Sequence, residues 1–120
     1  MKRLLTTLLL AAAAWTAPAQ GRIETFTLRS DILGCEKSCS VYLPEGYDDT
    51  TVDYPVLYLL HGASGYHGDW AEKGNMARIT DEAIAAGMAL PMVVVMPDAS
   101  GTGPNYTGDH MGYFNVPGWD

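Results

Sequence analysis

The segment whose residue types most clearly suggest chemistry is a glycine-rich turn that directly follows an apolar run. Val56 to Leu60 is continuously apolar, and His61-Gly62-Ala63-Ser64-Gly65 comes next. Glycine permits backbone conformations in which amide N–H groups point outward from a turn. Two such amides can stabilise the negative oxygen of a tetrahedral intermediate, and losing one donor typically slows a reaction by ~10²–10³. Residues 61–65 are therefore candidates for the anion-stabilising part of a catalytic site.

The elements around this turn predict a strand–helix–strand unit. Residues 56–60 and 91–97 are apolar runs without alternation, which is typical of strands buried on both faces of a parallel sheet. The stretch between them has apolar residues at helical spacing, begins after Asn75 as a candidate cap and ends before Gly87. A parallel unit of this kind has a right-handed crossover.

An antiparallel hairpin is expected before this unit. Residues 24–33 and 38–43 are rich in strand-forming side chains, and a glycine-containing turn separates them. A hairpin followed by a parallel unit predicts an α/β fold with a mixed, incomplete sheet. The segment after Met96 is rich in turns and shows no clear helix or strand, as is common for functional loops.

The two cysteines raise the question of a disulfide. Cys35 and Cys39 lie four residues apart, so on one extended strand they would be too distant to bond. Across a tight turn they could reach the Cα separation of ~5.5–6 Å that a disulfide favours. The alternative is two small apolar side chains at the end of a hairpin. The pair is a disulfide candidate.

The first 19 residues have the pattern of a secretory signal peptide. Lys2 and Arg3 precede an apolar stretch at 4–14, and Ala17-Pro18-Ala19 supplies a cleavage signature. The stretch is shorter than the ~20 residues that a spanning helix needs. We expect residues 20–120 to be the N-terminal portion of a single domain, in a secreted or periplasmic protein that has no membrane attachment after cleavage.

Composition and charge exclude several other classes of function. The formal net charge is −7, which argues against a basic footprint for nucleic acid and against docking on anionic lipid. No cofactor motif is present. His61, His67 and Asp69 lie in one short stretch with no second cluster, so neither a metal site nor a cofactor is predicted.

The chain resembles a known family at this point. The pattern VYLP-x-GY … YPVLYLLHG … W … VVVMPD covers residues 41–47, 54–62, Trp70 and 93–98. It resembles secreted esterases of the α/β-hydrolase superfamily, a group with feruloyl and acetyl-xylan esterases, S-formylglutathione hydrolases and mycolyltransferases. The resemblance implies that the fold is the N-terminal part of an α/β-hydrolase. It also implies that the amide of Ala63 is the first oxyanion-hole donor, with His61 and Gly62 shaping the turn.

The sequence departs from that family in one respect. The family uses a serine on a G-x-S-x-G turn, followed by an acid and a histidine. None of the five serines has a glycine both two residues before it and two residues after it, so no catalytic residue is assigned in this chain. We expect a chain that stops before its nucleophile and is inactive alone. Ser100, Asp109 and His110 occur in the right order, but adjacent side chains on an extended segment point apart, so Asp109 would orient His110 poorly.

Three further residues are candidates for substrate binding, each with a structural alternative. Trp70 would line an acyl or aromatic pocket, or else anchor a loop. Asp98 ends a strand on the side where α/β proteins bind ligands, or else caps a turn. Tyr106 would contribute, with neighbouring aromatic residues, to a platform for a sugar or phenolic ester, or else pack a long loop.

The expected function is that of a serine carboxylesterase. By the resemblance, its substrate is a small-molecule or polysaccharide ester, such as a feruloyl or acetyl ester of plant polysaccharide, cleaved through an acyl-enzyme. Two alternatives stay open. The same site would support an acyltransferase if another alcohol replaced water, and the esterase scaffold could serve as an exported glycan-binding module without catalysis.

Overall fold

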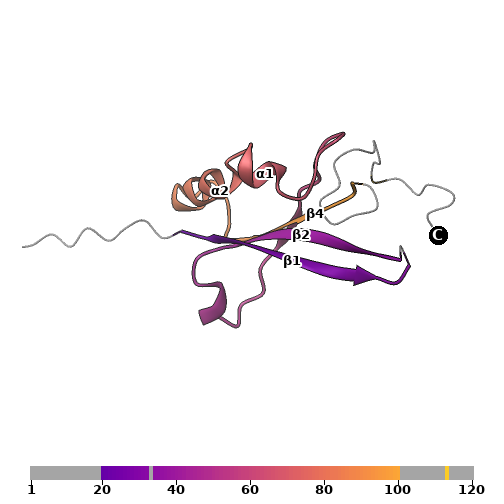
Figure 1. Ribbon diagram of the computed structural model, residues 1–120. Coiled ribbons are helices and arrows are strands. Elements are labelled where there is room, and N and C mark those ends of the chain that lie inside the picture. Colours follow the sequence, from indigo (N-terminus) through magenta and orange to yellow (C-terminus); the bar gives the residue numbers. More distant parts are fainter. Residues whose placement is uncertain (1–19, 33, 101–112, 114–120) are drawn as a thin grey trace, which may run out of the picture.

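The computed structural model of the chain describes residues 20–32, 34–100 and 113. In this part of the chain the elements are, in order, β1 (Arg22–Ser30), β2 (Cys35–Leu43), the 3₁₀ turn η1 (Tyr47–Asp49), β3 (Val56–Tyr58), α1 (Asp69–Glu72), α2 (Met76–Ala85) and β4 (Val93–Pro97). Figure 1 shows both α-helices on one face of the sheet and η1 on the other.

The described strands form one mixed sheet in the order β1-β2-β4-β3. β1 and β2 make the antiparallel hairpin, with Phe26 opposite Cys39. β2 also pairs antiparallel with β4, and β3 pairs parallel with β4, with Val56 opposite Val93. The predicted hairpin and the predicted parallel unit are thus confirmed, and β4 joins them at the centre of the sheet.

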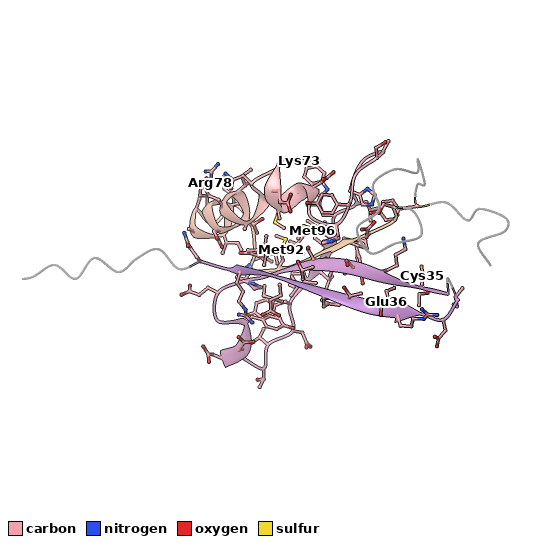
Figure 2. The ribbon with its side chains drawn as sticks, in the orientation of Figure 1. Cys35, Glu36, Lys73, Arg78, Met92 and Met96 are labelled. Carbon is pink, nitrogen blue, oxygen red and sulfur yellow. The ribbon has the colours of Figure 1, made fainter. Side chains whose placement is uncertain are left out.

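The core lies between the sheet and helix α2. Tyr42, Val94 and Met96 point to this face from the two central strands and pack with Met76 of the helix. All four side chains are buried, and Tyr42 is completely so. Figure 2 shows Met96 between the helices and the sheet. Because β4 carries the turn that follows Pro97, this core holds one wall of the candidate site in place.

The boundaries of helix α2 match the sequence pattern. Asn75 precedes the helix in the left-handed region, with φ of 50°, and forms no side-chain cap. Gly87 follows it with φ of 69°, a backbone conformation that glycine adopts without steric cost. The short helix α1 and the 3₁₀ turn η1 were not predicted from the sequence.

The expectation that β3 is buried on both faces is wrong. Val56, Leu57 and Tyr58 are 52%, 46% and 67% exposed. The physical reason is position, because β3 is an edge strand within the described residues and has a hydrogen-bonded neighbour only at β4. β4, which has neighbours on both sides, buries Val94 and Met96 but leaves Val93, Val95 and Pro97 partly exposed, so the expectation of burial on both faces is met on one face only.

The disulfide between Cys35 and Cys39 is not formed. Both cysteines are free, and both lie on β2. Four residues on one strand span ~13 Å, which is well beyond disulfide reach. The hairpin turn lies at 31–34, three residues earlier than expected, so Cys35 opposes Ser30 as a strand residue at the far end of the hairpin (Figure 2). Burial raises the pKa of the Cys39 thiol.

The predicted signal peptide at 1–19 lies outside the described residues. Among the residues that the structure describes, no helix has the length and apolar character needed to cross a membrane.

Candidate functional site

The glycine-rich turn after β3 is closed by its own backbone. The amide of Gly65 donates to the carbonyl of Gly62 at 3.1 Å, and Ser64 adopts a φ of 60°. Gly65 has no room for a side chain, because a Cβ there would lie 2.4 Å from the carboxylate of Asp69 and 3.2 Å from the ring of His61. This close packing fixes the turn against α1 and against the preceding residue.

The turn leaves the amide of Ala63 available. Ala63 occupies the second position of the Gly62–Gly65 turn, whose closing hydrogen bond uses only the first carbonyl and the last amide. Within the part of the chain that the structure describes, the N–H of Ala63 donates to no partner. The carbonyl of Gly62 and this N–H belong to one planar trans peptide and point in opposite directions. The carbonyl faces into the turn, so the amide faces out of it.

The ring of His61 joins the two loops that follow the parallel strands. Its Nδ1 lies 2.8 Å from the carbonyl oxygen of Gly62, after β3. Its Nε2 accepts a hydrogen bond of 2.9 Å from the amide of Ala99, after β4. The side chain is 2% exposed. His61 thus holds the turn, as the resemblance implied, and also holds a loop 38 residues further along the chain.

Asp98 acts as a turn cap, which is the structural alternative considered for it. Its Oδ1 accepts hydrogen bonds from the amide of Ser100, at 2.7 Å, and from the Ser100 hydroxyl. Its side chain is fully buried and lies 3.8 Å from Nε2 of His61. Oδ2 is buried without a partner among the described residues. The hydroxyl of Ser100, itself buried, is therefore committed to Asp98 rather than presented as a nucleophile.

Tyr113 closes the same corner from a distant part of the sequence. Its hydroxyl accepts from the amide of His61 at 3.3 Å and donates to the carbonyl of Pro97 at 3.0 Å. Its ring lies against His61, with centroids 5.2 Å apart. Burial raises the pKa of Tyr113, and this keeps the phenol neutral and able to donate.

Trp70 lies beside the turn and borders an open hollow. Its indole N–H donates to the carbonyl of Leu60 at 2.9 Å, which fixes the ring, and 39% of the residue is exposed. The hollow has a volume of about 380 Å³. It is lined by His61, Gly62, Asp69, Trp70, Lys73 and Gly74. A fixed aromatic face beside an outward-facing amide can bind an apolar group next to a polarised carbonyl.

The structure thus brings together most of the residues that the sequence singled out. His61, Gly62 and Trp70 line one hollow next to the Gly62–Gly65 turn that contains Ala63, and the buried carboxylate of Asp98 lies 3.8 Å from the His61 ring. Tyr106 is outside the described residues, so its predicted contact is untested. Sequence analysis did not find the contact of Tyr113 with His61, because no spacing rule links positions 52 residues apart. No group of three or more histidine, cysteine, aspartate or glutamate side chains that could hold a metal occurs among the described residues.

The sheet order, the parallel crossover and the turn at the carboxyl end of β3 define the N-terminal part of an α/β-hydrolase fold. The family model Esterase, described as "Putative esterase", matches residues 30–118. The chain therefore belongs to this esterase family of the α/β-hydrolase superfamily.

Known relatives agree with this assignment. An endo-1,4-beta-xylanase/feruloyl esterase of Xylanibacter ruminicola is 38% identical over 80 residues, which cover 63% of this chain and 11% of that protein. A solved ferulic acid esterase matches with a TM-score of 0.74 and 37% identity, over 84% of this chain and 38% of its own. An S-formylglutathione hydrolase from Agrobacterium tumefaciens matches with a TM-score of 0.55 and 31% identity, over 75% of this chain and 29% of its own. The chain spans about a tenth to two fifths of the length of these relatives.

Proposed function

We propose that residues 20–120 form the oxyanion side of an exported serine carboxylesterase that cleaves feruloyl or acetyl esters of plant polysaccharide. The observation that carries this proposal is the outward-facing amide of Ala63 at the carboxyl end of β3. Ligands of open α/β sheets bind at this end of the strands. The names of the feruloyl esterase relatives support the substrate class, and the pattern at residues 1–19 supports export.

The chemistry assigned to the chain is the stabilisation of charge. When a nucleophile attacks the ester carbonyl, the carbonyl oxygen becomes an oxyanion, and a preformed N–H donor at hydrogen-bond distance stabilises it without reorganisation. The amide of Ala63 supplies one donor, and the residue after the nucleophile supplies the second in this superfamily. The exposed face of Trp70 would pack against an aromatic acyl group in the adjoining hollow.

A hybrid enzyme tests the role of Ala63. Residues of this chain replace the matched segment of the solved ferulic acid esterase, and hydrolysis of methyl ferulate is measured. Ala63→Pro deletes the N–H donor, and we expect kcat/KM to fall by about 10²–10³. Ala63→Gly keeps the donor and serves as the matched control, with an expected change of less than about threefold. A hybrid whose activity is the same with Ala63→Pro would show that this amide is not the oxyanion donor.

The chain by itself gives a second test. We expect residues 20–120 to hydrolyse no p-nitrophenyl acetate, because no serine in the sequence lies on a G-x-S-x-G turn. Turnover that is lost on Ser100→Ala would contradict this account and would make Ser100 a nucleophile.

A further inference from the structure

The two ring nitrogens of His61 both contact backbone groups whose hydrogen-bonding roles are fixed. The amide of Ala99 can only donate, so Nε2, at 2.9 Å, must accept. The carbonyl of Gly62 can only accept, so Nδ1, at 2.8 Å, must donate. Each contact independently requires the same neutral tautomer, with the proton on Nδ1 and none on Nε2.

We propose that His61 is the positioning residue of the oxyanion turn and that it acts only as this Nδ1–H tautomer. The proposal rests on the proposed function, because it explains what sets the direction of the Ala63 N–H. The carbonyl of Gly62 and the N–H of Ala63 are the two ends of one rigid peptide. A donor that holds the carbonyl therefore sets the direction of the N–H.

The second contact gives the turn a fixed support. The loop after β4 begins on the buried core strand, and its Ala99 amide holds the His61 ring from the side opposite Gly62. The His61 imidazole therefore connects the turn that follows the exposed edge strand β3 to the loop that follows the buried strand β4. This explains why a nearly inaccessible histidine lies beside a turn made of small residues.

Protonation would break one contact and keep the other. A proton on Nε2 removes the acceptor of the Ala99 amide, while Nδ1–H still donates to Gly62. Among the described residues, the titratable groups near the ring are the carboxylate of Asp98, with Oδ1 3.8 Å from Nε2, the phenol of Tyr113, and Asp69 of α1, which is paired with Lys73 at 2.7 Å. Oδ1 of Asp98, the oxygen at 3.8 Å from Nε2, already accepts from the amide of Ser100, so a protonated ring would lose the Ala99 contact without gaining a hydrogen bond at that distance.

His67 offers a matched control within the same segment. It is as buried as His61, at 8% exposure. Its Nδ1 contacts the hydroxyl of Ser40 at 2.8 Å, a group that can donate or accept and therefore fixes no tautomer. No hydrogen bond from the His67 ring to the backbone of the turn is present among the described residues.

Two substitutions separate the two contacts. The amide nitrogen of asparagine lies near the position of Nδ1, so His61→Asn can keep the donor to Gly62 and loses the acceptor for Ala99. The carbonyl of glutamine reaches near the position of Nε2, so His61→Gln can keep the acceptor and loses the donor. His67→Gln should affect neither.

The test uses the full chain labelled with ¹⁵N, near neutral pH. The imidazole nitrogen shifts of His61 should show a protonated Nδ1 and an unprotonated Nε2. Amide exchange at Ala99 should speed up by about tenfold in His61→Asn at the same pH, whereas Gly65 exchange and the Ala63 nitrogen shift should stay unchanged. His61→Gln should shift Ala63 and speed exchange at Gly65, with Ala99 still protected.

Several outcomes would overturn the proposal. These are an Nε2–H tautomer, equal loss of protection across the chain in both variants and in His67→Gln, or no protection of Ala99 and Gly65 in the unchanged chain. None of these readouts requires catalysis. If the tautomer is as proposed but Ala63→Pro leaves the activity of the hybrid enzyme unchanged, only the proposed function is rejected. His61 would then hold a turn that binds no oxyanion.

Discussion

One face of the sheet packs against helix α2, whereas the opposite face carries large apolar side chains that remain exposed. On the covered face Tyr42, Val94 and Met96 are at most 1% exposed. On the open face Phe26 and Tyr58 are 46% and 67% exposed. The register places Tyr42 beside Val94 on the first face and pairs Tyr58 with Val95 on the second. The two sets therefore lie on opposite faces of one sheet, the buried set on the central strands β2 and β4 and the exposed set on the outer strands β1 and β3.

The comparison shows that apolar sequence and burial are separate properties. Removal of apolar surface from water stabilises a fold by roughly 25 cal/mol per Å², so only the covered face contributes fully. An exposed apolar edge strand also leaves backbone groups available for pairing with other chains. We therefore expect substitutions on the covered face to change the free energy of unfolding and those on the open face to change association.

The largest effect is expected for truncation of the core methionine. Met96→Ala removes a side chain that is 1% exposed and leaves a cavity, so the free energy of unfolding should fall by about 2–5 kcal/mol in chemical denaturation. Met88→Ala is the matched control, because Met88 is 79% exposed, and its effect should stay below about 0.5 kcal/mol. Equal losses at the two positions would remove the distinction between the covered face and the surface.

Much of this architecture could be predicted from the sequence because its signals are local. The hairpin, the helix between Asn75 and Gly87 and the parallel pairing of residues 56–58 with 93–95 follow from periodicity and turn residues. The exposure of β3 could not be predicted, since burial of a strand depends on neighbours that its own sequence does not specify. The cysteines were misplaced because the hairpin turn lies three residues earlier in the chain than expected, at 31–34 instead of 34–37, which puts Cys35 on the strand.

The candidate site divides in the same way. The turn at 61–65 could be predicted, because glycine content and the preceding strand are sequence signals, whereas the choice of the Ala63 amide came from the family resemblance and stays a prediction. The support of the turn could not be predicted. The hydrogen bonds from Ala99 and Tyr113 to His61 cross 38 and 52 residues of sequence and depend on how the two loops meet in space.

An intermediate effect is expected at the hydroxyl of the buried core tyrosine. Tyr42 donates to Oδ1 of Asp81 at 2.7 Å, so Tyr42→Phe leaves one fewer hydrogen bond to that carboxylate and should cost about 1–2 kcal/mol. Tyr58→Phe, on the open face, should cost less than about 0.5 kcal/mol. Urea denaturation of the two variants measures the difference. A smaller loss for Tyr42→Phe than for Tyr58→Phe would contradict the assignment.

The same tyrosine gives the stability a pH dependence. Burial, with the bond to Asp81 as a further cause, raises the pKa of Tyr42 above its ordinary value. The unfolded state then releases the phenol proton at a lower pH than the folded state does, so stability should fall as the pH rises above ~10. Tyr42→Phe should make this fall smaller. An unchanged alkaline fall in the variant would mean that other groups account for it.

The smallest effect on stability, and the clearest effect on association, is expected at the exposed edge. Tyr58→Lys places a charge on β3, where the side chain is 67% exposed, so the free energy of unfolding should change by less than about 0.5 kcal/mol. A charge on an edge strand opposes pairing between chains, so the variant should sediment with a lower average mass than the unchanged chain at equal concentration. Arg78→Ala, which acts on the exposed surface of α2, controls for surface changes away from the edge. If Tyr58→Lys loses stability as Met96→Ala does, then β3 is buried in solution and the open face has a cover that the described residues do not supply.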